Sequence, residues 1–263
     1  HEQTVIPPPH AGWHVRRKSR HFAAYDRVAG DFAQAMGIDP WLINPDFAVC
    51  GRINFQEREG EECLASNVDA VLTRVRAKYA QYGVKEAPFV IVKADAGTYG
   101  MGIMTVRDAA EVKGLNRKQR NKMAVVKEGL EVSSVIVQEG VPTFESIHDA
   151  IAEPVVYMID RFVVGGFYRV HAARGRDENL NAPGAQFVPL AFESPCIPDL
   201  AEPAGCAPNR FYAYGVVARL ALLAAAVELE RTAHRVAPAP TASVAAAIAG
   251  KGAAIAACGG LLW

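Results

Sequence analysis

One lysine and the glycines that follow it form the most chemically informative segment of this sequence. Lys93 ends an apolar run at residues 88–93, and three glycines lie within the next nine residues. Glycine lets backbone N–H groups close over phosphate oxygens, and a lysine beside them adds a compact ammonium charge. The segment therefore predicts a phosphate-binding loop. The residues predicted to contact the phosphates are Lys93, Gly97, Thr98, Tyr99, Gly100, Met101 and Gly102.

The elements on either side of the glycines distinguish between kinds of phosphate loop. A Walker loop and a dinucleotide-binding loop are both followed by a helix. Here residues 103–106 follow the glycines, and their β-branched side chains predict a strand. A protein kinase also has a loop between strands, but its lysine lies on a later strand. The order strand, lysine, glycine-rich loop, strand is that of ATP-grasp enzymes. The alternative is an ordinary glycine-rich hairpin with a partly buried lysine.

A further strand, predicted over residues 134–138, lies about 45 residues after the lysine and runs into a loop. In ATP-grasp proteins such a junction is the hinge between two lobes, and its backbone contacts the adenine. The predicted adenine-binding residues are Gln138, Glu139, Gly140 and Val141. The alternative is a strand end that is simply solvated.

A dense basic segment lies near the start of the chain. Arg16, Arg17 and Arg20 are candidates for binding the α-carboxylate of a substrate, because a protein with no net charge must concentrate positive charge locally to hold an anion. Arg16 and Arg20 would share a face if a helix begins this early. The alternative is a solvated basic face at a helix start.

The composition narrows the class of protein. Of the 263 residues 51% are hydrophobic and 21% are charged, and Lys plus Arg balance Asp plus Glu at 28 each. This balance is typical of a globular enzyme and argues against nucleic acid or an anionic membrane as the main partner. The five cysteines include no C-x-x-C pair, so we expect reduced thiols in a cytoplasmic protein rather than a disulfide framework or zinc ribbon.

Apolar periodicity predicts helices over residues 19–36, 64–82 and 210–234. The last is very apolar but contains Arg219, which favours a buried helix over a membrane span. Residues 154–164 and 167–173 predict a hairpin that turns at Gly165-Gly166. The remaining segments are predicted as loops over residues 39–62 and 174–208, a polar basic stretch over 108–128 and an Ala-rich tail over 236–263.

Together these segments resemble the ATP-grasp-type glutamate–cysteine ligases (γ-glutamylcysteine synthetases) of some bacteria, over about residues 10–233. The resemblance is carried by GWHVRRKSRHF, PFVIVKADAGTYGMGIM, VQEGVPT, and DRFVVGGFYRVH followed by ENLNAPG. In related glutathione synthetases a hairpin strand ends in an arginine, with an Asn-Leu pair some ten residues on. Arg169 and Asn179 match that spacing, and the resemblance implies that both are catalytic.

The resemblance implies an α+β, ATP-grasp-like fold in which two lobes hold the nucleotide between them. It also implies ATP-dependent joining of the glutamate γ-carboxylate to the cysteine amine through an acyl phosphate, with ATP and Mg²⁺ required. The expected parts are an N-terminal part of a truncated domain (1–87), a small lobe (88–140), a large lobe (141–235) and the tail (236–263).

The magnesium ligands are the main departure from that family. The family carries them on a late strand, and no such strand is predicted after Asn179. Asp95 is the candidate ligand within the chain, although an aspartate before Gly97 also suits a turn. We expect further carboxylates to lie in a missing N-terminal part. The alternative function is therefore a nucleotide-binding ATP-grasp fragment without catalysis, and we expect this chain alone to bind nucleotide weakly and not to ligate.

Overall fold

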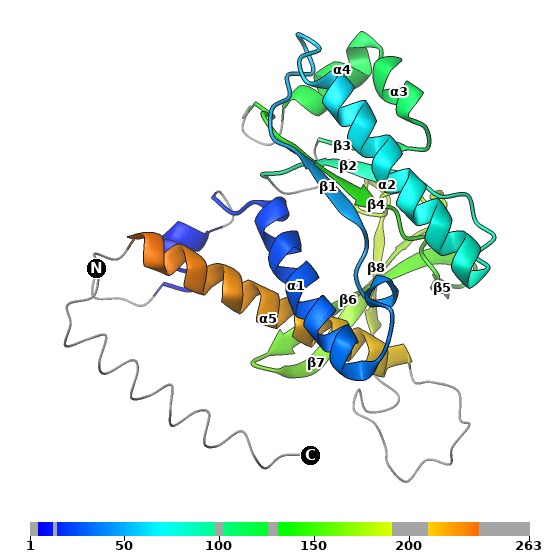
Figure 1. The fold of residues 1–263 in the computed structure, drawn as a ribbon. Coiled ribbons are helices and arrows are strands. Elements are labelled where there is room, and N and C mark those ends of the chain that lie inside the picture. Colours follow the sequence, from blue (N-terminus) through cyan, green and yellow to red (C-terminus); the bar gives the residue numbers. More distant parts are fainter. Residues whose placement is uncertain (1–4, 13–14, 98–101, 126–130, 191–209, 237–263) are drawn as a thin grey trace.

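The computed structural model describes residues 5–12, 15–97, 102–125, 131–190 and 210–236 (Figure 1). Its mixed helix-and-sheet class agrees with the sequence prediction, and within the described residues it has two antiparallel four-stranded sheets. The helices are α1 (Lys18–Met36), α2 (Glu61–Tyr82), α3 (Ala109–Lys113), α4 (Arg117–Ala124) and α5 (Arg210–Val236), with 3-10 turns at Pro9–Ala11 and Pro40–Leu42.

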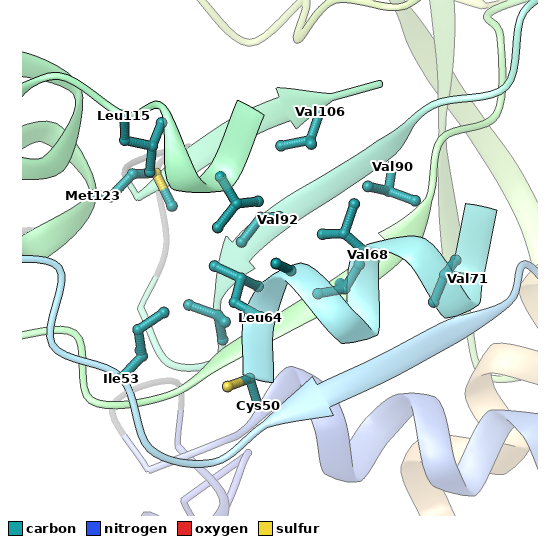
Figure 2. Close-up of a cluster of buried hydrophobic side chains, with 14 of the residues drawn as sticks. Cys50, Ile53, Leu64, Val68, Val71, Val90, Val92, Val106, Leu115 and Met123 are labelled. Atoms are coloured by element: carbon teal, nitrogen blue, oxygen red, sulfur yellow. The ribbon is translucent and has the colours of Figure 1, made fainter. Parts of the chain in front are cut away.

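The first sheet has the strand order β1-β4-β2-β3. Its strands are β1 (Phe47–Cys50), β4 (Val135–Glu139), β2 (Val90–Ala94) and β3 (Ile103–Val106). Helix α2 lies across one face, and Figure 2 shows its Leu64 and Val68 packed against Val90 and Val92 of β2. Because side chains alternate along a strand, Ile91 and Lys93 point to the opposite face, away from this core.

The second sheet has the order β5-β6-β7-β8. Its strands are β5 (Ser146–Ile147), β6 (Ala150–Ile159), β7 (Phe162–His171) and β8 (Gln186–Leu190). The β6–β7 hairpin confirms the predicted pairing but not the predicted turn. The chain reverses at residues 160–161, where Asp160 has a φ of 54°.

Gly165 and Gly166 instead lie inside β7, opposite a register shift between Tyr157 and Met158. A Cβ atom at Gly166 would lie 2.0 Å from the carbonyl oxygen of Val155 on β6. The two glycines therefore serve a bulge where backbones approach closely, which produces the same local sequence pattern as a tight turn.

Helices α1 and α5 pack against each other beside the sheets (Figure 1). Their contact buries Ala29 of α1 and Ala224 of α5, and Gly37 ends α1 with a left-handed φ of 65°. By length and composition, Tyr212–Thr232 could cross a membrane, and 22% of its apolar window is buried in the fold. The sequence predicted a buried helix in preference to a membrane span, whereas α5 buries one stripe that includes Leu220 and Ala224 and exposes residues such as Leu223.

Two of the predicted loops contain short strands. Strand β1 lies within residues 39–62, and β8 lies within residues 174–208. The polar stretch at 108–128 holds α3 and α4. Pro45 and Gly51 lie close to β1, and β8 contains Pro189. These residues favour a loop in sequence, so pairing with a neighbour decides both strands. The proposed domain boundaries stay predictions, and residues 237–263 of the tail lie outside the described residues.

Candidate functional site

Lys93 and Gln138 project from adjacent strands on the sheet face opposite α2. Ile91 pairs with Gln138 in the β2–β4 register, so Lys93 lies two residues along the same face. The Lys93 Nζ donates a hydrogen bond to Gln138 Oε1 over 2.7 Å. Burial lowers the pKa of Lys93, and the positive charge of Lys18 lowers it further, while Glu153 opposes the shift.

Lys18, in the first turn of α1, reaches the same region and was not among the residues selected from the sequence. Its Nζ donates to the carbonyl oxygens of Ala94 (2.7 Å), at the end of β2, and Gly97 (3.0 Å), the first residue of the glycine-rich loop (97–102). Burial lowers the pKa of Lys18; Asp95 opposes this shift and Arg17 adds to it. The available sequence signal was its place within the basic run beside Arg17.

Asp95 joins the start of α1 to the base of the loop. Its carboxylate oxygens accept hydrogen bonds from the Ser19 backbone N–H (2.7 Å) and the Ser19 hydroxyl (2.8 Å). Its carbonyl oxygen accepts from the Lys18 N–H over 2.9 Å. Both carboxylate oxygens thus stabilise the N-terminus of a helix. The role of Asp95 as a magnesium ligand stays a prediction.

The glycine-rich loop has a well-defined base. Gly97 and Gly102 have φ values of 89° and 61°, which residues with a Cβ atom rarely adopt. The Ala94 N–H donates to the Gly102 carbonyl oxygen over 2.8 Å and so closes the two strands. The residues predicted to contact phosphate at 98–101 lie outside the described residues.

The predicted hinge (residues 138–141) separates into two environments. Glu139 is buried, and its carboxylate accepts from Trp41 Nε1 at 3.0 Å and from the Asp46 N–H at 2.9 Å. Burial raises the pKa of Glu139, and these hydrogen bonds oppose the shift. The Glu139 side chain therefore holds the segment around Trp41 in place, whereas the Gln138 side chain points to Lys93.

Gly140 allows the hinge to pass close to an aromatic ring. Its N–H donates to the Phe89 carbonyl oxygen over 2.8 Å, and a Cβ atom there would lie 2.0 Å from the Phe89 ring. Val141 follows with an exposed side chain. The close packing at Gly140 fixes the chain where it leaves the first sheet.

Arg169 lies on the second sheet, directly opposite Glu153 in the β6–β7 register, and the two form an ion pair. The Nε atom of Arg169 is buried without a hydrogen-bond partner among the described residues. Glu153 also acts electrostatically on Lys93. The second sheet therefore brings one arginine and one carboxylate to the same neighbourhood as the lysines.

Asn179 lines a pocket of about 710 Å³ between β3, α3, α4 and residues 174–183. Its Oδ1 accepts from the Asn181 N–H over 3.0 Å, and the side chain is exposed. Asp177 nearby pairs with Arg107, which follows β3. The pocket thus extends from the strand that follows the glycine-rich loop to the segment that follows β7.

The three predicted substrate arginines have different surroundings. Arg16 binds Glu228 of α5 through two contacts, Nε to Oε1 at 3.1 Å and Nη2 to Oε2 at 2.7 Å, and Glu228 is buried. The hydrogen bond with Glu228 raises the pKa of Arg16, although burial opposes it. Within the described part of the chain, Arg17 and Arg20 have no ion-pair partner. Of the three predicted arginines, Arg17 and Arg20 are therefore the two available to an anion.

No described group of three or more His, Cys, Asp or Glu side chains is arranged to hold a metal ion. In the described part of the site, Lys18 and Lys93 lie near the Arg169–Glu153 ion pair, and the site does not provide a magnesium-binding set of carboxylates.

The sequence and the fold are similar to those of known proteins. The glutamate-cysteine ligase family matches over residues 1–229. The chain belongs to that family. No curated protein matches. A crystal structure of a "putative gamma-glutamylcysteine synthetase" from Methylobacillus flagellatus KT superposes with a TM-score of 0.77 at 68% identity, covering 88% of this chain. The match covers 55% of that protein, so this chain spans about half the length of its relative.

Proposed function

We propose that this glutamate–cysteine ligase family chain supplies the nucleotide-binding part of an ATP-dependent enzyme, which joins the γ-carboxylate of glutamate to the amine of cysteine. The observation that carries the proposal is the meeting of Lys18 and Lys93 at the base of the glycine-rich loop. Burial lowers the pKa of each lysine. Two cations held close together need a ligand of high negative charge, and a triphosphate is such a ligand.

In this proposal the ATP phosphates lie between the two sheets, in an ATP-grasp-like arrangement. Lys93 and the loop backbone hold the α- and β-phosphates, and Lys18 keeps the loop entrance in position through Ala94 and Gly97. The adenine lies toward the hinge that follows Gln138. Positioning and charge neutralisation account for most catalysis in phosphoryl transfer, so no nucleophilic side chain is required.

The reaction proceeds in two balanced steps. A γ-carboxylate oxygen of glutamate attacks the γ-phosphorus of ATP, the bond to the bridging oxygen breaks, and ADP leaves. The cysteine amine then attacks the acyl carbon, phosphate leaves with the C–O electron pair, and the amine loses a proton to form the amide. In this proposal Arg169, whose Nε has no hydrogen-bond partner among the described residues, binds the transferred phosphoryl group. Arg17 and Arg20 would bind the substrate α-carboxylate.

Mg²⁺ neutralises nucleotide phosphates in this class of reaction when it is bound. The carboxylates of the described residues do not fit such a site, because Asp95 is engaged by Ser19 and Glu153 by Arg169. The same observation favours the second candidate function, a chain that binds nucleotide but does not ligate. If the chain is part of an active ligase, its magnesium ligands come from residues beyond the described ones.

ADP release and product mass separate the two functions. The chain, and a protein extended to the length of its relative, would each be incubated with ATP, Mg²⁺, glutamate and cysteine. Ligation predicts ADP and γ-glutamylcysteine in equal amounts, both lost when either amino acid is omitted. Nucleotide binding without either product, in both proteins, would support the non-catalytic function. Absence of ATP binding in both would overturn both proposals.

A further inference from the structure

Two cysteines outside the proposed ATP site lie in contact. The sulfur of Cys50, the last residue of β1, lies 3.4 Å from that of Cys63 in the first turn of α2, and the Cys50 thiol donates to it. Cys50 is 1% exposed, whereas Cys63 is exposed to solvent. Figure 2 shows Cys50 at the edge of the core beneath α2. One thiol is thus accessible and its neighbour is protected.

We propose that Cys63 and Cys50 form a reversible disulfide by exchange with a low-molecular-weight disulfide. Cys63 is the entry thiol, because a small disulfide can reach it from solvent. Cys50 is the resolving thiol, because it touches Cys63 and the core shields it from external reagents. The contact between the sulfurs means that the two elements already lie close enough to be joined.

The exchange balances in atoms and electrons. The Cys63 thiolate attacks one sulfur of the small disulfide, a mixed disulfide forms on Cys63, and one small thiolate leaves. The Cys50 sulfur, after losing its proton, attacks the Cys63 sulfur and expels the second small thiolate. Two protein thiols are oxidised to one disulfide, and one small disulfide is reduced to two small thiols.

The surroundings of the two thiols favour this order of events. Burial and the hydrogen bond with Cys63 together raise the pKa of Cys50 to about 11, so Cys50 is a poor first nucleophile. The Cys50 thiol also lies 3.7 Å from the Arg52 carbonyl oxygen, and the Asn67 amide donates to Cys63 Sγ at 3.7 Å. Once Cys63 is in a mixed disulfide with the small thiol, the adjacent Cys50 sulfur reacts with it at a high effective concentration.

The disulfide would join the end of the edge strand to the helix that covers the sheet. Cys50 pairs with Val135 on β4, and Val135 pairs with Ala94 on β2, whose carbonyl oxygen accepts from Lys18. The thiol pair therefore ends a row of paired residues that leads to the base of the glycine-rich loop. It remains separate from the residues proposed to contact ATP.

The test uses the chain with its other three cysteines, Cys196, Cys206 and Cys258, replaced by serine. This protein is incubated with cystine at mildly alkaline pH, quenched with acid and analysed by intact mass and peptide mapping. We expect a loss of two hydrogens with no retained cysteine adduct, a peptide crosslink between Cys50 and Cys63, and full reversal by dithiothreitol.

Single substitutions in that background test the order of the steps. Cys50→Ser should stop the reaction at a stable cysteine adduct on Cys63, whereas Cys63→Ser should give at least tenfold slower modification and no crosslink. Cys50→Ala repeats the first test without a hydroxyl in the core, and unfolding midpoints identify variants that retain the fold. A lasting Cys63 adduct in the presence of Cys50, or no reaction at either thiol, overturns the proposal.

Discussion

The Lys93 ammonium donates a 2.7 Å hydrogen bond to the Gln138 amide oxygen across two antiparallel strands. This contact joins the strand before the glycine-rich loop to the strand that leads into the hinge. A neutral amide oxygen satisfies one of the three ammonium donors and adds no negative charge. Lys93 therefore keeps its charge available for an anionic ligand while its position is fixed.

Lys93→Met should weaken ATP binding at least tenfold, because the variant keeps the apolar stem but loses the charge, and tenfold corresponds to about 1.4 kcal/mol. Isothermal titration measures the affinity, and far-UV circular dichroism should be unchanged. Lys118→Met, at an exposed position on α4, is the matched control and should bind as the parent chain does. Equal affinity of the two variants would remove Lys93 from the nucleotide site.

Lys18→Met should also weaken ATP binding, because the loop entrance loses two hydrogen bonds at Ala94 and Gly97. Lys18→Arg keeps the charge but has a longer, planar head group, so we expect partial recovery. Hydrogen exchange of the amides of residues 94–97 should increase in the methionine variant. Unchanged exchange there, together with normal ATP affinity, would show that Lys18 does not hold the loop.

Arg169→Lys should reduce the ligation rate of the extended protein by tenfold or more, with ATP affinity changed less than threefold. The planar guanidinium can contact Glu153 and a phosphoryl oxygen together, which a lysine cannot reproduce. Single-turnover kinetics separates the rate from binding. Arg58→Lys changes an exposed arginine paired with Glu61 and serves as the control. A parental rate for Arg169→Lys would place Arg169 outside the reaction.

Gly140→Ala should destabilise the chain by about 1–3 kcal/mol, because the added Cβ lies 2.0 Å from the buried Phe89 ring. The free energy of unfolding in urea measures this cost. Phe89→Leu provides space, so the double variant should lose less stability than the sum of the two single variants. Additive losses would mean that the ring and the hinge backbone are not in contact.

Asp39→Asn should lower the free energy of unfolding by about 1 kcal/mol at pH 7, with allowance for solvent screening of the Lys78 pair. Lys78 and the Trp41 N–H are the largest causes that lower the pKa of Asp39 from 3.8 to about 2. Because the pKa of Asp39 is lower in the folded protein than in the unfolded one, its ionised carboxylate stabilises the fold above pH 3.8. This stabilisation is lost as the pH falls through about 2. The difference between parent and variant, measured by urea unfolding, should shrink from pH 5 to pH 3; a constant difference would contradict the assignment.

The sequence by itself determined the longer helices, the strands around the glycine-rich loop and the family of this protein. Periodic apolar residues and a closing glycine define α1 and α2, and β-branched runs define β2, β3 and β4 close to their observed bounds. The order of Lys93 and the glycines led to the nucleotide-binding prediction. Each of these signals is contained in a window of some twenty residues, where the chain's own pattern dominates.

Only the tertiary structure decided which groups meet. Lys18 binds Ala94 and Gly97 from 76 and 79 residues away, and Arg16 is engaged by Glu228 from 212 residues away. The structure also showed that Gly165-Gly166 serves a bulge and that β1 forms an edge strand. Such outcomes depend on packing between distant segments, because a short edge strand or a basic side chain has no local pattern that specifies its partner.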